Sequence, residues 1–418
     1  CLKSKILFNS FYWELIVQLE DIENQVIYSK ILDSLIFLAQ QKFGKNFIEQ
    51  ISKTKTFTNI LMKTDSKKNI DDVKYYLDSQ IKTFDLQRNN ICIPVKPKYV
   101  SDELIYEKLE IKNSAKYPML MTFNCSDKTK NITDKFLYEI IFKKEDLRKD
   151  KIIISIIRMM DMILKKEENL DLNILHYRVV PITSKGGYVE IVKGAETLYH
   201  INEKMNFSIQ NYLMNNNTEN TVQEIREKFT KSTAAFCVIT YLLGIGDRHL
   251  DNIMLTKDGI LFHIDFGFIV GFDPKPLAPN MRITPDMVDA IGGISSDNYK
   301  NFKNICTKAF NCLRRHTDIF MDMLLLLPNA TPPISDNFQI SDEQLTNEII
   351  NRFLPGHTYE EAELQFIVHM EKSYNTSKHA VYDFFHYHNK EATLSRNISN
   401  AINKASDVAK NLFNYIQM

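Results

Sequence analysis

The first ninety residues carry a helical pattern of apolar positions. Between residues 11 and 43, apolar side chains recur at intervals of three and four, the spacing that places them on one face of a helix. A polar break at residues 67–69 interrupts a second helical pair. The pattern therefore predicts a helical region over residues 1–90, whose role is packing rather than chemistry.

The pattern changes to short, strand-like apolar runs between residues 91 and 193. These runs occupy residues 91–94, 104–111, 119–123, 136–143, 177–182 and 188–192. One long helical run, over residues 150–165, is inserted among them. We therefore expect an antiparallel sheet that carries one helix.

Residues 194–418 return to a helical pattern, with one exception. Residues 253–256 and 260–264 are apolar runs joined by a turn at residues 257–259, which predicts a short β-hairpin. Near the end of the chain, apolar residues recur every three or four positions, at Leu394, Ile398, Ile402, Ala405, Val408, Leu412 and Ile416. This stripe predicts a C-terminal amphipathic helix that packs on the helical half or lies on a bilayer.

Together these patterns predict an α+β fold with two lobes. An antiparallel-sheet lobe covers residues 91–193 and a mostly helical lobe covers residues 194–418, with the helices of residues 1–90 before them. A ligand is expected in the crevice between the two lobes. Because the sequence begins at Cys1 rather than at methionine, we also expect it to be a fragment of a longer protein.

Composition and charge exclude several classes of protein. Lysine plus arginine equal aspartate plus glutamate at 52 each, so no global basic field recruits nucleic acid, and we predict no nucleic-acid partner. The six cysteines show neither metal-ligand spacing nor a dense disulfide pattern, which indicates reduced thiols in the cytosol. No apolar run approaches the roughly 18 residues of a transmembrane helix. These features predict a cytoplasmic protein whose membrane contacts come from local patches.

Glycine is concentrated in one stretch of the chain. Only 12 of the 418 residues are glycine, yet seven of them lie between Gly244 and Gly293. Glycine is favoured where the backbone turns tightly or approaches a ligand.

Closing the predicted hairpin in this stretch brings Asn252 and Asp265 to the same end. A divalent cation that bridges nucleotide phosphates prefers hard oxygen ligands and keeps several waters, so these two side chains are predicted ligands for magnesium, with manganese as the alternative.

The residues before Asn252 suggest a proton acceptor. Asp247 precedes Asn252 by five residues, the interval between the catalytic aspartate and the metal-binding asparagine of protein kinases. His249 has an ordinary pKa near 6.5, so it can accept a proton from a substrate hydroxyl at neutral pH, while Asp247 orients it or shares the role. Arg248 is interpreted as a residue that braces the loop. His263 is open to two interpretations, a packed strand residue or a site residue.

The strings Asp-Arg-His at residues 247–249 and Asp-Phe-Gly at residues 265–267 resemble the phosphatidylinositol 3- and 4-kinase superfamily. Flanking strings at residues 231–243, 273–279 and 287–293 resemble class III phosphatidylinositol 3-kinase, the vacuolar-sorting lipid kinase family. The resemblance covers roughly residues 90–390. It implies a bilobal kinase-like fold and ATP-dependent phosphorylation of the 3-hydroxyl of phosphatidylinositol, in endosomal and autophagic membrane trafficking.

A lysine and an acid in the sheet lobe match the family's phosphate-binding pair. Lys143 ends the strand-like run of residues 136–143, and Asp150 opens the following helix. A buried ammonium neutralises nucleotide phosphates when a carboxylate orients it. The string here is one residue shorter than the family's and lacks its glycine, so Lys144 remains an alternative to Lys143. Tyr177 matches the family tyrosine that helps to anchor this pair.

The resemblance implies three further contacts with ATP. Ser114, in a loop without glycine, would donate a hydrogen bond to phosphate as the family's serine does. The hinge that receives adenine through backbone groups would include Ile191 and Val192. From sequence alone, these residues are also compatible with an ordinary polar turn and an ordinary strand.

The segment from residue 266 to residue 284 indicates the substrate. Each phosphomonoester on an inositol ring adds roughly −1.5 to −2 charges, so an enzyme for polyphosphorylated lipid needs several cations there. This segment has only Lys275 and Arg282, offset by Asp273. The balance favours plain phosphatidylinositol.

The resemblance also implies partners and a location for the full-length protein. These are a kinase-like regulatory subunit, a Beclin-type subunit, and a peripheral position on endosomal and autophagic membranes. Two alternatives stay open. A serine/threonine protein kinase of the phosphatidylinositol-kinase-like class shares the Asp-Arg-His and Asp-Phe-Gly strings, and the shortened region around Lys143 fits a catalytically inactive scaffold.

Overall fold

A computed structural model gives the fold of the protein. It describes residues 2–65, 69–112, 116–129, 134–217, 221–271, 273, 279–325 and 341–374. The chain divides into two compact units. Unit 1 comprises Cys1–Ile163, Leu175–Lys193 and Asp318–Thr346, and unit 2 comprises Leu164–Ile174, Gly194–Thr317 and Asn347–Met418. The predicted α+β fold, with helices first, then an antiparallel sheet and many further helices, is confirmed. The predicted three-domain division remains a prediction.

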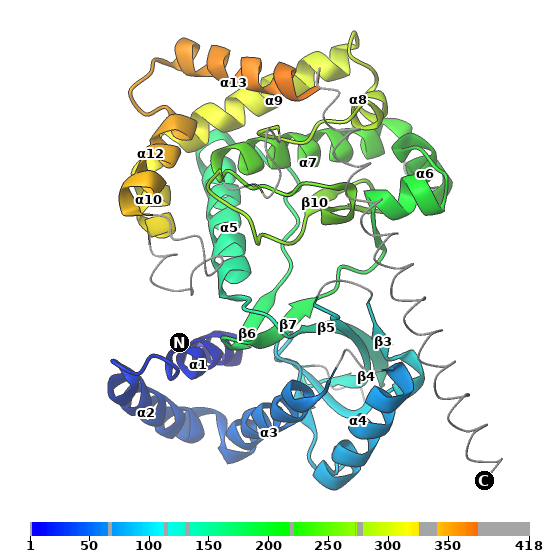
Figure 1. Ribbon diagram of the computed structural model, residues 1–418, viewed down its shortest axis with the longest axis vertical. Helices are drawn as coiled ribbons and strands as arrows, with labels where there is room; N and C mark the ends of the chain where they lie inside the picture. Colours follow the sequence, from blue (N-terminus) through cyan, green and yellow to red (C-terminus); the bar gives the residue numbers. More distant parts are fainter. Residues whose placement is uncertain are drawn as a thin grey trace, which may run out of the picture. The chain divides into compact units, whose positions relative to one another are not determined.

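Unit 1 begins with four helices (Figure 1). They are α1 Lys5–Gln18, α2 Gln25–Phe43, α3 Lys45–Lys63 and α4 Ile70–Phe84. The helical region predicted over residues 1–90 is therefore confirmed, although the continuous repeat of residues 11–43 contains a break between α1 and α2. Gly44 lies between α2 and α3 and has a φ of +87, which is not helical and so ends α2. Glycine adopts this backbone conformation without strain, whereas other residues rarely do.

The sheet of unit 1 has seven antiparallel strands. They are β1 Ile91–Cys92, β2 Tyr99–Leu104, β3 Glu110–Ile111, β4 Met119–Asp127, β5 Phe136–Lys143, β6 Val179–Thr183 and β7 Gly186–Glu190. The order is β1-β2-β4-β5-β7-β6, with β3 paired to β4. Alternate residues of the central strands, such as Met121 and Phe142, are completely buried, which is the period-2 pattern of a strand with one face on the core.

The strand predicted over residues 104–111 is wrong. The chain leaves β2 at Leu104, makes a 3-10 turn, η1 Tyr106–Lys108, and enters the two-residue strand β3. Leu104 and Leu109 are both buried on either side of this turn, so the apolar run marks burial of a turn rather than a strand. The first residues of β2 were missed, because Ser101 and Asp102 make the segment look polar. Ser101 is nevertheless buried, since its hydroxyl donates to the Asn124 carbonyl at 2.8 Å.

The helix predicted over residues 150–165 is α5 Arg148–Glu168. Asp146 accepts a hydrogen bond from the Arg148 backbone N–H at 3.0 Å and so satisfies a donor at the helix start. Ile153 and Ile156 are completely buried, as the three- and four-residue spacing of apolar positions requires. Lys151 of this helix forms an ion pair with Glu14 of α1.

Unit 2 is built around one buried helix. This helix is α7 Val222–Leu242, whose residues from Ser232 to Leu242 are all buried. It begins with a capping box, in which Thr221 and Glu224 satisfy each other's backbone N–H groups. Helices α8 Pro285–Ile291 and α9 Asp297–Arg314 pack against α7 (Figure 1). Unit 2 also contains η2 His200–Lys204, α6 Ile209–Asn216 and α13 Tyr359–Tyr374. Almost all of α10 Thr317–Leu325 belongs to unit 1, and α12 Asp342–Phe353 begins in unit 1 and continues in unit 2.

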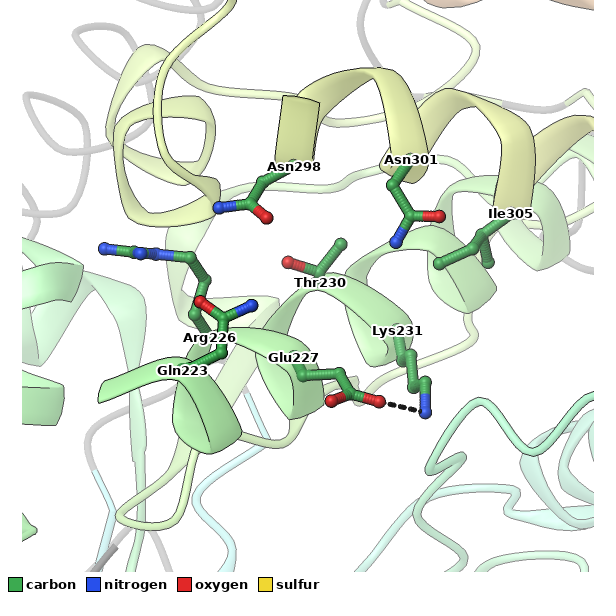
Figure 2. A pocket seen from close by; sticks show the side chains of 8 residues that line it. All are labelled: Gln223, Arg226, Glu227, Thr230, Lys231, Asn298, Asn301 and Ile305. Carbon is green, nitrogen blue, oxygen red and sulfur yellow. Dashed lines mark ion pairs between the residues drawn. The ribbon is translucent and has the colours of Figure 1, made fainter. Parts of the chain in front are cut away.

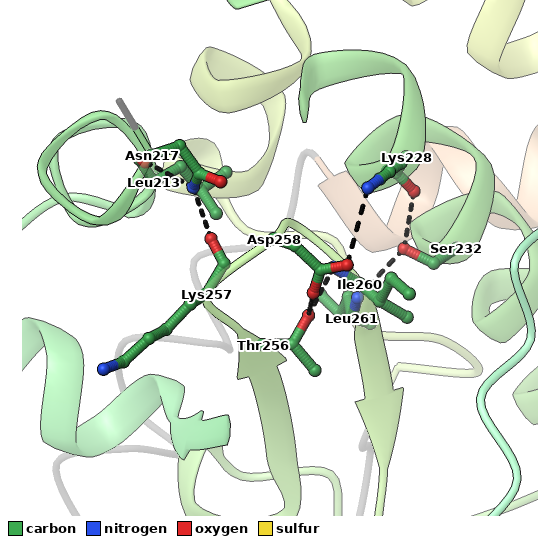
Figure 3. Close-up of polar contacts among 9 residues, drawn as sticks. All are labelled: Leu213, Asn217, Lys228, Ser232, Thr256, Lys257, Asp258, Ile260 and Leu261. Carbon is green, nitrogen blue, oxygen red and sulfur yellow. Dashed lines mark hydrogen bonds and ion pairs between the residues drawn. The ribbon is translucent and has the colours of Figure 1, made fainter. Parts of the chain in front are cut away.

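The predicted hairpin is confirmed as β9 Ile253–Thr256 and β10 Leu261–His263. A third strand that the sequence pattern missed, β8 Ala195–Thr197, pairs with the other edge of β9. Polar contacts fix the turn of the hairpin (Figure 3). Thr256 Oγ1 donates to Asp258 at 2.6 Å, and Ser232 Oγ of α7 accepts from the Leu261 N–H at 2.9 Å. The hairpin is therefore held firmly at the end opposite to Asn252 and Asp265.

Across the parts of the chain that the structure describes, helices that are long and apolar enough to span a bilayer are absent. The predicted C-terminal amphipathic helix lies outside the described residues.

Candidate active site

The open end of the β9–β10 hairpin brings Asn252 and Asp265 together. The strand register pairs Ile253 with His263, and the Ile264 N–H donates to the Asn252 carbonyl at 3.1 Å, so the pairing continues one residue beyond the strands. Opposed Cα atoms in such a ladder lie about 5 Å apart, and the next residue is about 3.4 Å further along the chain. The backbones of Asn252 and Asp265 are therefore neighbours, as the sequence predicted.

The two side chains at this end present hard oxygen atoms. Asn252 is buried, and its Nδ2 donates to the Asp247 carbonyl at 3.0 Å. Because the amide nitrogen is committed to that bond, the amide oxygen points away from it. Asp265 is exposed, and one carboxylate oxygen accepts from the Gly267 N–H at 3.3 Å. One amide oxygen and one carboxylate fit a magnesium ion that also takes oxygens from nucleotide and water.

Arg248 ties the Asp-Arg-His loop to the Asp-Phe-Gly segment. It is buried, and its Nε donates to the Gly246 carbonyl at 2.7 Å. Its Nη1 donates to the Ile264 carbonyl at 2.8 Å, and its Nη2 donates to the Asp265 carbonyl. A planar guanidinium with fixed donors suits three carbonyls better than a lysine would. These contacts are those of the bracing residue that the sequence suggested.

Both candidate acids adopt strained backbone conformations. Asp247 has φ 54 and Asp265 has φ 62, in the left-handed region that costs residues other than glycine about 1 kcal/mol or more. The Asp247 N–H donates to the Asp273 carboxylate at 2.8 Å, which helps to hold this conformation. The Asp247 carboxylate lies 3.7 Å from His249 Nε2. The structure therefore groups Asp247, His249, Asn252 and Asp265 at one end of one hairpin.

Two neighbouring residues have structural contacts. His263 is buried and stacks on the ring of Phe236, with centroids 4.9 Å apart. Burial, followed by the charge of Arg248, lowers the pKa of His263 well below its ordinary value, so the ring is neutral and packed. The hydroxyl of Thr197 on β8 lies 3.4 Å from the carboxylate of Asp251. The burial and ring stacking of His263 support its interpretation as a packed strand residue.

The predicted phosphate-binding pair lies in unit 1. Lys143 is the last residue of β5 and forms a 2.9 Å ion pair with Glu145, while Asp150 is in the first turn of α5. Lys144 is half-buried, and burial lowers the pKa of its ammonium group. Both lysines therefore remain candidates. Tyr177 is buried, and its carbonyl accepts a hydrogen bond from an arginine of α5, which fastens the segment before β6 to that helix.

The remaining predicted residues are placed as follows. Ile191 and Val192 directly follow β7, are half-buried and lie outside the strands. Arg282 is buried, with 4% of its surface exposed. Ser114 and Lys275 lie outside the described residues. Their roles in binding nucleotide or lipid remain predictions.

The sequence did not single out Arg352, which adjoins the loop. Its Nη1 donates to the Tyr241 carbonyl at the end of α7, just before the Asp-Arg-His loop. The sequence contained only an indirect indication of this arginine. Gly244 and Gly271 permit a close approach of two backbones, but nothing in their spacing identifies the side chain that covers them.

A polar cavity lies between α7 and α9 (Figure 2). It is lined by Gln223, Arg226, Glu227, Thr230, Lys231, Asn298, Asn301 and Ile305. Glu227 and Lys231 form a 2.5 Å ion pair at its edge. None of the predicted site residues lines this cavity. Among the described residues, no three histidine, cysteine or acidic side chains gather as a metal site.

The chain is similar to known proteins over much of its length. Residues 137–333 match the family model described as phosphatidylinositol 3- and 4-kinase. Phosphatidylinositol 3-kinase pik3 of Schizosaccharomyces pombe is 31% identical over 382 residues, which cover 84% of this chain and 45% of the relative. Phosphatidylinositol 3-kinase VPS34 of Saccharomyces cerevisiae is 28% identical, over 90% of this chain and 42% of the relative. The protein of the same name from Arabidopsis thaliana is 33% identical, over 64% and 33%.

The chain spans less than half the length of each of these relatives. The matched region contains β5, α5 and the whole hairpin with its loop, so the similarity covers the residues that the motifs identified. Residues 137–333 therefore match the phosphatidylinositol 3- and 4-kinase family, and most of the chain is similar to proteins named phosphatidylinositol 3-kinase.

Proposed function

We propose that this chain transfers the terminal phosphate of ATP to the 3-hydroxyl of phosphatidylinositol, giving phosphatidylinositol 3-phosphate. One observation carries the proposal. The end of the β9–β10 hairpin places the Asn252 amide and the Asp265 carboxylate beside the Asp247–His249 pair. The relatives are named phosphatidylinositol 3-kinase, which supports the same substrate.

Each residue has a role that its position supports. Asn252 and Asp265 would hold magnesium, which neutralises charge on the phosphates when it is bound. His249, oriented by Asp247, would accept the proton of the attacking hydroxyl, since the imidazole is a base near neutral pH. Lys143 with Asp150 would neutralise the nucleotide phosphates. Catalysis would then be mainly positioning and electrostatic stabilisation.

The substrate proposal extends to the membrane. Lys275 and Arg282 would supply the few cations that plain phosphatidylinositol requires, and the segment lacks the charge for a polyphosphorylated headgroup. In the full-length protein we place the reaction on endosomal and autophagic membranes, with a kinase-like regulatory subunit and a Beclin-type subunit. The support for these partners is the resemblance of the motifs to class III phosphatidylinositol 3-kinase.

Identification of the product tests this proposal. The chain is incubated with radiolabelled ATP, magnesium and vesicles that contain phosphatidylinositol, and the lipid product is separated from its 4-phosphate isomer. We expect phosphatidylinositol 3-phosphate from the wild type and almost none from Asp265→Asn. A parallel reaction with peptides tests the alternative, because a labelled peptide without labelled lipid would indicate a protein kinase. Nucleotide-dependent thermal stabilisation without any labelled product would indicate a scaffold.

A further inference from the structure

The segment after Asp-Phe-Gly is paired directly to the loop that leads to Asp247. The Val270 N–H donates to the Leu243 carbonyl at 2.8 Å, and the Gly271 N–H donates to the Gly244 carbonyl at 2.9 Å. A methyl group at Gly244 would lie 2.3 Å from the Gly271 nitrogen. Only glycine allows the two backbones to approach so closely.

Arg352 of α12 lies against this glycine contact. Its Nη1 donates at 3.0 Å to the Tyr241 carbonyl in the last turn of α7, which also accepts from the Gly244 N–H at 3.2 Å. The same guanidinium forms a 3.3 Å ion pair with Glu348, and the arginine side chain is only 13% exposed. Methyl groups at Gly244 and Gly271 would lie 3.0 Å and 3.1 Å from its Nε and Nη2. The guanidinium therefore packs on both glycines.

Helix α13 contacts the other described end of the same segment. His369 Nδ1 lies 3.0 Å from Asn280 Nδ2, the geometry of a hydrogen bond that the amide donates to a neutral ring. The rings of His369 and Tyr241 are 5.3 Å apart, and the Arg352 guanidinium lies 6.0 Å from that tyrosine ring. One buried tyrosine thus joins the two helices.

The two ends of the segment and the arginine share one space. A small cavity is lined by Gly244, Ile245, Gly246, Gly271, Asp273, Pro279, Asn280 and Arg352. Asp273 in this lining is also the residue whose carboxylate accepts from the Asp247 N–H. The cavity that Arg352 lines is therefore also lined by a residue that binds the backbone of the candidate catalytic loop.

We infer that Arg352 and His369 are positioning residues, which fix the described ends, Gly271 and Asn280, of the segment between Asp-Phe-Gly and α8. The inference rests on the proposed function, because in that reaction this segment meets the lipid headgroup. Loss of either contact leaves Gly271 or Asn280 with more accessible conformations, and ordering these residues when lipid binds then costs entropy. Lipid binding is weakened, whereas nucleotide binding through Asn252 and Asp265 is retained.

Two variants with different chemistry test the inference. Arg352→Met keeps the apolar stem and removes the donors, and His369→Phe keeps the ring on Tyr241 and removes the acceptor. We expect hydrogen exchange in residues 268–271 and 279–283 to become about fivefold faster or more in each variant. The KM for phosphatidylinositol in phosphatidylcholine vesicles rises by about fivefold or more, while the Kd for ATP with magnesium changes by less than about twofold. Lys300→Met, an exposed lysine of α9, is the control and changes none of these values.

The inference is overturned if exchange in the two peptides and the lipid KM both stay at the wild-type values. It is also overturned if both variants lose nucleotide affinity as much as lipid affinity, because the role is then structural. Arg352→Lys, which keeps one donor for the Tyr241 carbonyl, recovers part of the lipid affinity if the inference holds. If the wild type itself does not phosphorylate phosphatidylinositol, the proposed function fails, and the exchange rates alone decide whether the two residues hold the segment.

Discussion

At the scale of single residues, the predicted chemistry rests on backbone conformation as much as on side chains. Asp247 and Asp265 are held at positive φ. Asn252 donates to the Asp247 carbonyl, and Arg248 donates to the Asp265 carbonyl. The sequence predicted which acids to examine because their spacing is that of a phosphoryl-transfer loop. It could not predict which carbonyls Arg248 binds. Every residue carries a backbone carbonyl, so the sequence does not show which of them lies near the guanidinium.

Gly244→Ala tests the close backbone contact at this scale. The added methyl group would lie 2.3 Å from the Gly271 nitrogen, and the φ of 56 is itself unfavourable for alanine. We expect a loss of about 3 kcal/mol or more in the free energy of unfolding, measured by urea denaturation.

Gly293→Ala is the matched control, because Gly293 also has a positive φ, of 90, but has open space where a methyl group would be added. Here we expect a loss of about 1 kcal/mol from the backbone conformation alone. Equal losses in the two variants would show that the contact between Gly244 and Gly271 does not require glycine.

At the scale of elements, the β9–β10 hairpin is the part of the site that the sequence predicted best. Its alternating apolar runs and the turn at Gly259 are local signals, so they are visible in the sequence. Strand β8 was missed because it is three residues long and is stabilised by pairing with a strand almost sixty residues later. The strand predicted at residues 104–111 was wrong because burial of a turn imitates a strand.

Ser232→Ala tests how firmly α7 holds the hairpin. The buried Leu261 N–H points away from β9 and donates to the Ser232 hydroxyl, so alanine would leave this donor without its acceptor. An unsatisfied buried donor costs about 1–3 kcal/mol, and we expect that loss in urea denaturation. In Ser155→Ala, the exposed hydroxyl bonds only to its own helix, and the change should be smaller than about 0.5 kcal/mol. A neutral result for Ser232→Ala would mean that the hairpin does not depend on α7.

His369, which joins α13 to Asn280, predicts that the stability of the fold depends on pH. Burial, with the charges of Lys372 and Arg352, lowers the pKa of His369. Below its ordinary pKa near 6.5, the unfolded chain binds a proton that the folded state resists, so the stability of the fold decreases as the pH decreases. The slope from this group is at most about 1.4 kcal/mol per pH unit.

His369→Phe removes this titration. We therefore expect a shallower decline in the unfolding free energy of the variant between pH 7 and pH 5 than in the wild type, measured by urea denaturation at each pH. Parallel curves for the two proteins would contradict the lowered pKa of His369.

At the scale of the whole molecule, the fold class was predictable because the hydrophobic period changes from helical to strand-like and back along the chain. Which residues form each of the two units was not predictable. Residues 318–346 belong to unit 1 although most of the chain around them belongs to unit 2, and only long-range contacts determine such membership. Over the whole chain, basic and acidic residues are equal in number. Membrane affinity therefore has to come from local features rather than from a general basic field.

Binding of manganese in the presence of a non-hydrolysable ATP analogue, followed by electron paramagnetic resonance, tests the central claim most directly. We predict one tightly bound ion per chain, with affinity reduced about tenfold or more in Asn252→Ala and Asp265→Asn. Asp258→Asn, at the opposite end of the same hairpin, should bind as the wild type does. Wild-type affinity in Asn252→Ala and Asp265→Asn would contradict the account, because the metal would then be held somewhere else.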